Sequence, residues 1–114
     1  MKMKKSDIVI TVGTDENNVP CEIVWKAKDN PSGPKNAECK AFILSLFEKD
    51  TQETLRIDLW TKEMQVAEMD RFIFATLKGI SDTYYKATNN ANLANDMQKF
   101  VQYFGEKTEI LKPE

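Results

Sequence analysis

The chain has 114 residues, of which 41% are hydrophobic and 30% are charged. This length and composition fit one globular domain and exclude a disordered chain. Its 16 basic and 18 acidic residues give a net charge of -2, which argues against nucleic acid or an anionic membrane surface as a partner. The sequence has no histidine, so it lacks the commonest general base and metal ligand.

The N-terminal half of the sequence shows the alternation of apolar and polar residues that is typical of strands. Residues 7–13 and 21–27 each alternate, and the Asp- and Asn-rich stretch between them predicts a hairpin turn. Polar residues, Pro and Gly then predict a loop at 28–36. Residues 37–47 are mostly apolar and do not follow the alternation of a half-buried strand, which predicts a strand covered on both faces. Residues 53–60 give the clearest alternation of the chain and predict a fourth strand.

The apolar period then changes to that of a helix. Apolar residues recur every three or four positions from Val66 to Tyr84, which is one stripe of an amphipathic helix. Thr61 is the expected N-cap, with residues 62–65 as the alternative start. Gly79 lies inside this helix and costs about 1 kcal/mol relative to alanine.

A second helix is predicted near the C-terminus. Thr88-Asn89-Asn90 interrupts the first apolar stripe and provides the next cap, and a second stripe runs from Leu93 to Phe104. Gly105 is the expected end of this helix. The charged residues 106–114 are expected to form a frayed tail of the single domain, 1–114, and the alternative is that Ile110-Leu111 docks on the domain.

Four strands followed by two helices predict an α+β domain. Short connections favour one four-stranded antiparallel meander, with both helices packed on one face of the sheet. The other face is then open, and the apolar strand 37–47 must place one of its two sets of side chains on it.

We therefore predict an interaction surface on the open sheet face. It consists of Val24, Phe42, Leu44, Leu46, Arg56, Asp58 and Trp60. The occupant is either a partner protein or a second copy of the chain, which would make a homodimer. The alternative is that the stems of long charged side chains such as Lys26, Lys40 and Arg56 cover this patch. Arg56 and Asp58 would then form a cross-strand ion pair with Lys26 or Glu22.

The sequence contains no motif for catalysis or metal binding. The stretch from Asp15 to Asn18 begins like a calcium loop, but Val19 and Pro20 stand where such a loop needs a ligand and a glycine. Cys21 and Cys39 have no second cysteine pair beside them, so a zinc site is not expected. We expect no catalytic residue, no cofactor and no metal.

The chain is expected to lie in the cytoplasm. The apolar run behind the N-terminal lysines is shorter than a secretory signal requires, and no stretch approaches the ~18–20 apolar residues that span a bilayer. Both thiols are then expected to be reduced, because disulfides are rare in the cytoplasm. A disulfide between Cys21 and Cys39 is the alternative if their strands pair.

Three stretches of the sequence together resemble a known family. They are Thr14 to Pro20 ahead of Ile23-Val24-Trp25, Glu53 to Met64, and Phe72 to Asn90. In this order and spacing they are similar to the gliding motility protein GldC family, small cytoplasmic proteins of the Bacteroidetes. The resemblance runs from about Lys4 to Phe104, and Glu53 to Lys62 is its most specific part. The family leads us to expect a proline where this chain has Gln65.

The resemblance implies a non-enzymatic cytoplasmic accessory protein of the gliding machinery that acts through protein–protein contacts. It carries over no catalytic residue, because the family has none established. The alternative is a small-molecule or lipid carrier with a cavity between the sheet and the helices, lined by Trp25, Ile57, Ile73 and Leu77. A third hypothesis is an enzyme that uses a carboxylate or a cysteine.

Overall fold

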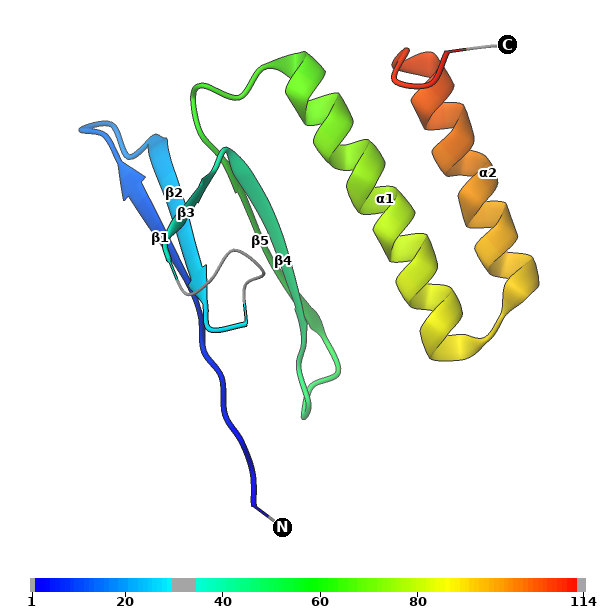
Figure 1. Cartoon of the computed structure of the whole chain (residues 1–114), viewed down its shortest axis with the longest axis horizontal. Coiled ribbons are helices and arrows are strands. Elements are labelled where there is room, and N and C mark those ends of the chain that lie inside the picture. The colour runs from blue at the N-terminus through cyan, green and yellow to red at the C-terminus, as the bar shows by residue number, and fades with distance from the viewer. Residues whose placement is uncertain (1, 30–34, 113–114) are drawn as a thin grey trace. The chain divides into compact units, whose positions relative to one another are not determined.

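The computed structural model describes residues 2–29 and 35–112. Its elements form two compact units. We call the one that ends at Met64 the strand unit and the one that begins at Gln65 the helical unit. The described elements are β1 (Ile8–Thr14), β2 (Pro20–Ala27), β3 (Ala37–Cys39), β4 (Ala41–Phe47), β5 (Thr54–Trp60), α1 (Val66–Thr88) and α2 (Ala91–Lys107) (Figure 1). The predicted α+β class with two C-terminal helices is confirmed. The packing of both helices on one sheet face stays a prediction.

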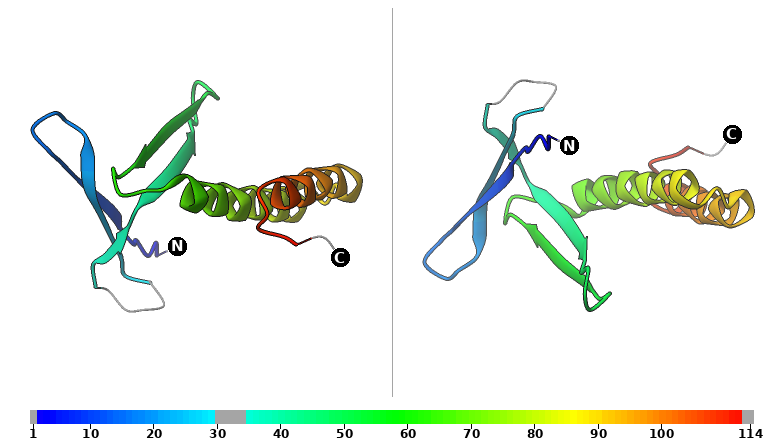
Figure 2. Two further views of the ribbon diagram at one scale, coloured as in Figure 1. Left: turned by 90° about the horizontal axis from the view of Figure 1, so that it is seen from above. Right: turned by 90° about the horizontal axis from the view of Figure 1, so that it is seen from below.

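The described strands form two antiparallel sheets, so the predicted single four-stranded meander is wrong. One sheet has the order β1-β2-β3 and the other consists of β4 and β5. The run from 37 to 47, predicted as one strand, bends at Lys40, whose carbonyl oxygen accepts a hydrogen bond from Thr61 N–H (2.8 Å). A strand that bends in this way can pair in one sheet before the bend and in another after it. Figure 2 shows the strands of the two sheets crossing at an angle.

The predicted hairpin of β1 and β2 is confirmed, and Asp15 organises its turn. The Asp15 Oδ1 atom accepts hydrogen bonds from the N–H groups of Asn17 (2.8 Å) and Val19 (3.1 Å). Its Oδ2 atom lies 3.3 Å from the Lys62 Nζ atom. The N–H groups of Val19 and Asn17, and then Lys62, hold the pKa of the Asp15 carboxyl below its ordinary value. The carboxylate therefore serves as a turn acceptor. The loop predicted at 28–36 falls largely on 30–34, outside the described residues.

The core of the strand unit lies on one face of the three-stranded sheet. The strand register places on this face Ile8, Ile10, Val12, Ile23, Trp25, Ala27, Ala37 and Cys39. Ile23 on the central strand β2 is only 1% exposed. The opposite face is more polar and carries Thr11, Lys26 and Glu38. The alternation predicted for residues 7–13 and 21–27 is thus confirmed as a half-buried sheet.

Helix α1 begins at Val66 with Gln65 as its N-cap, so the later of the two predicted starts is the observed one. The Gln65 N–H donates to Glu68 Oε1 (3.1 Å), which satisfies a backbone donor that the helix leaves free. Thr61 is not the cap, because its backbone N–H bonds to Lys40 at the end of the strands. The Thr61 side chain is buried, and its hydroxyl has no hydrogen-bond partner among the described residues.

Helices α1 and α2 form an antiparallel hairpin whose turn the sequence predicted correctly (Figure 1). Asn89 ends α1 in the left-handed conformation (φ 60°), and Asn90 caps α2 by accepting a hydrogen bond from Leu93 N–H (3.1 Å). Between the helices, the buried Ser81 Oγ donates to the Ala94 carbonyl oxygen (3.3 Å). Gln98 Nε2 donates in turn to Ser81 Oγ (3.0 Å). These contacts fix the register of the two helices.

The prediction that Gly105 ends the second helix is wrong, because α2 continues to Lys107. Gly105 instead allows a close approach. A Cβ atom at this position would lie 2.6 Å from Phe74 Cε1 and 2.7 Å from Leu111 Cδ1. The segment after the helix folds back, and Leu111 N–H donates to the Gly105 carbonyl oxygen (2.9 Å). The predicted tail of 106–114 therefore starts inside α2, and its last two residues lie outside the described part.

Candidate interaction surface

The β4–β5 hairpin has one entirely apolar face. The cross-strand pairs are Phe42 with Leu59, Leu44 with Ile57 and Leu46 with Leu55. Residues directly opposite each other in an antiparallel pair point to the same face. We call these six residues the apolar hairpin face: Phe42, Leu44, Leu46, Leu55, Ile57 and Leu59.

The other face of the hairpin combines charged and aromatic side chains. We call it the mixed hairpin face, and its residues are Ala41, Ile43, Ser45, Phe47, Thr54, Arg56, Asp58 and Trp60. Arg56 and Asp58 form an ion pair along β5, with Nε and Oδ2 2.9 Å apart. Phe47 and Trp60 are exposed at opposite ends of this face. Both faces of the hairpin therefore offer large apolar side chains.

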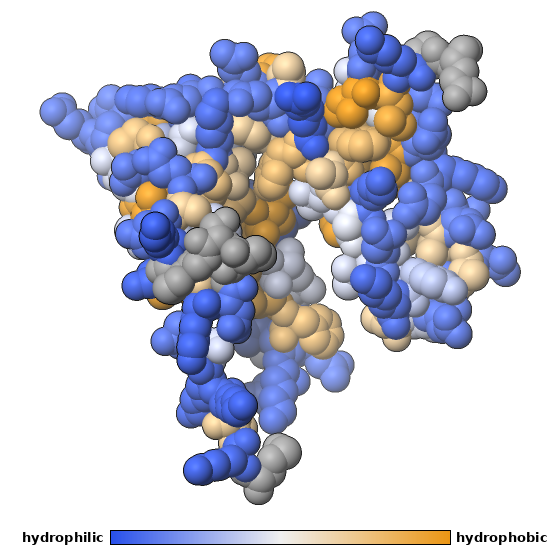
Figure 3. All heavy atoms as spheres, in the orientation of Figure 1, coloured by the Kyte–Doolittle hydropathy of each residue, from blue (hydrophilic) through white to orange (hydrophobic). Residues whose placement is uncertain are grey.

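The apolar hairpin face remains substantially exposed. The exposed fractions are 47% for Leu46, 50% for Leu55 and 44% for Ile57. Apolar surface over the β4–β5 hairpin is also visible in the space-filling view (Figure 3). Burial of such side chains by a partner is favourable at roughly 25 cal/mol per Å² of apolar area. A contiguous apolar patch of this kind is typical of interaction sites.

The structure divides the predicted interaction surface into three parts. Phe42, Leu44 and Leu46 lie together on the apolar hairpin face. Arg56, Asp58 and Trp60 lie together on the mixed hairpin face, which points the opposite way. Val24 lies in β2, on the more polar face of the other sheet, between Thr11 and Glu38.

The sequence reasoning missed three residues of the apolar hairpin face. Leu55, Ile57 and Leu59 alternate clearly in the sequence, but their partners depend on the register between β4 and β5. The turn at 48–53 sets this register, because Glu48 N–H donates a hydrogen bond to the Glu53 carbonyl oxygen (2.8 Å). Counting outward from this pair places Leu55 opposite Leu46.

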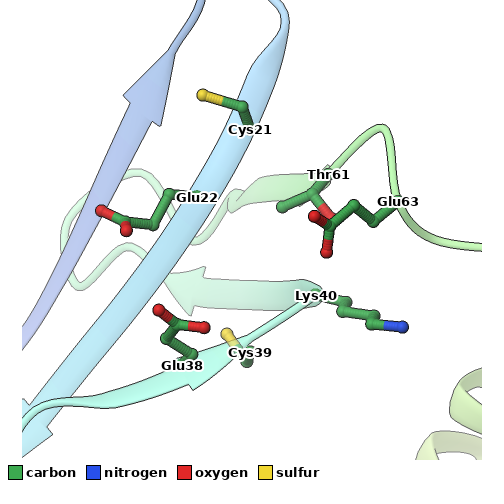
Figure 4. A pocket seen from close by; sticks show the side chains of 7 residues that line it. All are labelled: Cys21, Glu22, Glu38, Cys39, Lys40, Thr61 and Glu63. Carbon is green, nitrogen blue, oxygen red and sulfur yellow. The ribbon is translucent and has the colours of Figure 1, made fainter.

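A cavity of about 350 Å³ lies at the corner where the two sheets meet, and polar side chains line it. Cys21 and Glu22 come from β2, Glu38 and Cys39 from β3, Lys40 from the bend, and Thr61 and Glu63 from the segment after β5 (Figure 4). Within the described residues, no group of acidic or thiol side chains is arranged to hold a metal ion. The cavity is polar, in contrast to the apolar cavity expected for a carrier.

The two cysteines of this cavity are not joined by a disulfide. The Cys21 thiol is exposed and lies 3.5 Å from the Gly13 carbonyl oxygen, to which it donates. Cys39 is half-buried, and burial raises the pKa of its thiol, although a hydrogen bond with the backbone of Ala41 opposes this shift. Cys39 is therefore more fully protonated at neutral pH than a free thiol is.

We expect iodoacetamide to label Cys39 more slowly than Cys21 at pH 7–8, because the thiolate is the nucleophile. The labelling rate of Cys39 should rise with pH and approach that of Cys21 in strong denaturant, where burial is lost. Mass spectrometry of peptides after timed labelling measures both rates. Equal labelling of the two thiols in the folded protein would contradict the burial of Cys39.

The residues predicted to line a carrier cavity belong to different units. Trp25 and Ile57 lie in the strand unit, whereas Ile73 and Leu77 lie in α1. The carrier therefore stays a prediction. In the described part of the chain, neither helix has the length and apolar character needed to cross a bilayer.

Comparison with known families gives one match that covers most of the chain. The family model described as "Gliding motility-associated protein GldC-like" matches residues 20–110. The matched segment includes β2 to β5, α1 and α2, and therefore all of the residues of the two hairpin faces. A search of curated proteins and a search of solved structures found no match.

Proposed function

Because this chain belongs to the GldC-like family of gliding motility-associated proteins, we propose that it is a non-enzymatic accessory protein of the gliding apparatus. It acts by contacts with other proteins of that apparatus, and the β4–β5 hairpin is its contact surface. The observation that carries this proposal is the apolar hairpin face, where six apolar residues lie side by side and three of them are about half exposed.

The chemistry of the hairpin favours recognition of a protein. The core of a protein interface is enriched in aromatic and apolar side chains, and its rim is polar. The mixed hairpin face combines the exposed Trp60 with the ion pair of Arg56 and Asp58, and Trp and Arg are frequent among the residues that dominate binding energy. The partner proposed here is therefore a protein with a complementary apolar surface.

Three further observations support a non-enzymatic protein in the cytoplasm. The carboxylate of Asp58 pairs with Arg56, and Asp15 is used to hold a turn. The thiol of Cys39 has a raised pKa, which lowers its reactivity as a nucleophile. The free thiols of Cys21 and Cys39 are typical of a reducing compartment.

Affinity capture from the native cell, followed by mass spectrometry, tests this function and identifies the face that is used. Leu46→Ala removes an exposed side chain from the apolar hairpin face, and Trp60→Ala removes one from the mixed hairpin face. The variant on the face that binds the partner should capture about fivefold less of it, or still less. A fivefold loss corresponds to about 1 kcal/mol of binding free energy.

Leu93→Ala provides the matched control, because Leu93 is as exposed as Leu46 but lies in α2. It should leave capture unchanged. Circular dichroism should show that all three variants are folded, since each replaced side chain is about half exposed. Capture that is equal for wild type and both hairpin variants would rule out the hairpin as the contact surface.

A further inference from the structure

Strand β5 has one edge that is not paired with any described strand. In the described part of the chain it pairs with β4 and with no other strand. Natural proteins protect such edges with lysine, proline, bulges or very short strands, because a free edge can pair with another chain. β3 has only three residues, and β1 contains a register shift at Gly13/Thr14. β5 has seven residues and contains neither proline nor lysine nor glycine, and its two charged residues, Arg56 and Asp58, are opposite in sign.

The register shows which backbone groups of β5 point outward. Thr61 N–H donates to Lys40 O and Glu48 N–H donates to Glu53 O, each at 2.8 Å. Hydrogen-bonded and non-hydrogen-bonded pairs alternate along an antiparallel ladder. The odd-numbered residues of β5 therefore bond to β4. The N–H and C=O groups of the even-numbered residues, Thr54, Arg56, Asp58 and Trp60, point to the free edge.

The sequence of β5 is complementary to itself when two copies run antiparallel. A two-fold axis at Ile57 places Arg56 of each copy opposite Asp58 of the other. The same axis pairs Leu55 with Leu59 and Thr54 with Trp60. The outward groups of Arg56 and Asp58 then form a hydrogen-bonded pair across the axis, as the ladder requires.

Neighbouring registers are less favourable. An axis at Arg56 places the two guanidinium groups opposite each other, and an axis at Asp58 does the same with the two carboxylates. Like charges directly opposite each other destabilise a strand pair. The edge of β4 carries no charged residue from Ala41 to Phe47, so its side chains select no register.

From this complementarity we propose that two copies of the chain form a homodimer through the β5 edges, with the two-fold axis at Ile57. The two hairpins become one continuous four-stranded sheet of order β4-β5-β5-β4. Arg56 and Asp58 of both copies form a cluster of alternating charge on the mixed hairpin face. Ile57 meets Ile57 of the second copy on the apolar hairpin face. This inference deepens the proposed function. It rests on that function only because both assign the contacts to the β4–β5 hairpin.

Cysteine cross-linking tests the position of the axis. At a non-hydrogen-bonded pair the two Cα atoms are about 4.5 Å apart, which suits a disulfide. Ile57→Cys should therefore give a disulfide-linked dimer under mild oxidation at least about tenfold faster than Leu59→Cys, since the two copies of residue 59 lie about 13 Å apart. An equimolar mixture of Leu55→Cys and Leu59→Cys should also cross-link. The wild-type chain, which contains Cys21 and Cys39, measures the background.

Charge reversal tests the pairing without a covalent bond. The wild type should sediment as a dimer, and Arg56→Asp and Asp58→Arg should each be monomeric, because like charges then face each other across the edge. An equimolar mixture of the two variants should form dimers again, since every facing pair is once more opposite in charge. The ion pair within each chain stays broken in this mixture, so recovery of the dimer reports the contact between chains.

The proposal is overturned if the wild type is a monomer at the highest concentration attainable, or if the mixture associates no better than the single variants. It is also overturned if Ile57→Cys and Leu59→Cys cross-link at the same rate. These measurements use purified protein alone, whereas the proposed function is tested by capture from cells. A monomeric protein that still captures its partner would reject the dimer and retain the function.

Discussion

Ile23→Ala is expected to lower the free energy of unfolding of the strand unit by about 2–5 kcal/mol, the range for truncating a fully buried isoleucine. Ile23 is 1% exposed and sits on the central strand β2, where it faces Val12 on one side and Cys39 on the other. The lost carbon atoms leave a cavity in the core, where Ile23 is the only buried apolar side chain among the described residues of the strand unit.

Ile8→Ala is the matched control for this prediction. Ile8 is the same residue type on the same sheet face, but it is 74% exposed, so its truncation should cost less than about 0.5 kcal/mol. Urea unfolding followed by tryptophan fluorescence measures both variants, because Trp25 and Trp60 both lie in the strand unit. Equal losses at the two positions would show that the core does not lie around Ile23.

Alanine at the two helical glycines should change stability in opposite directions. Gly79→Ala should stabilise the helical unit by about 1 kcal/mol, the difference in helix propensity, because a Cβ atom there meets no described atom within 4 Å. Gly105→Ala gains the same propensity but forces its Cβ atom to within 2.6 Å of Phe74 and 2.7 Å of Leu111. Overpacking of this kind costs about 1–3 kcal/mol, so the variant should be no more stable than wild type and up to about 2 kcal/mol less stable.

Far-ultraviolet circular dichroism at 222 nm reports on this pair of variants, since the helical unit contributes most of the signal. The double variant Gly105→Ala/Leu111→Ala provides the rescue, because it removes one of the two side chains that crowd the new Cβ atom. It should recover part of the loss relative to Leu111→Ala alone. A Gly105→Ala protein as stable as Gly79→Ala would mean that Gly105 is not a site of close approach.

The elements of the fold could be predicted from local sequence, but the division into two sheets could not. Alternation identified β1, β2 and β5, and the helical period identified α1 and α2 to within a few residues. The bend at Lys40 has no sequence signal, since neither glycine nor proline marks it. It depends on the hydrogen bond from Thr61, a residue 21 positions later.

Gly105 illustrates why a residue type alone can mislead. Glycine after an apolar helical stripe is typical of a helix end, yet here the absent side chain makes room for Phe74 from the neighbouring helix. That contact joins residues far apart in the sequence. The local pattern therefore cannot distinguish a stop from a close approach.

The candidate surface was predictable in part. The strands that form it, and six of the residues on its two faces, follow from alternation alone. Their assignment to opposite faces required the register of β4 against β5, and the separate position of Val24 required the second sheet. The register is a property of the two paired strands. It follows from which residues close the turn at 48–53, and the alternation within each strand does not determine that.

The order in which the elements pair has a consequence for how the chain folds. β1 pairs with β2, β2 with β3, β4 with β5, and α1 packs on α2, so each partner is the next element along the chain. Short chain closures cost little entropy, and contacts between neighbouring elements of the chain favour fast folding. During synthesis, the β1–β2 and β4–β5 hairpins can therefore form as soon as their second strands have left the ribosome.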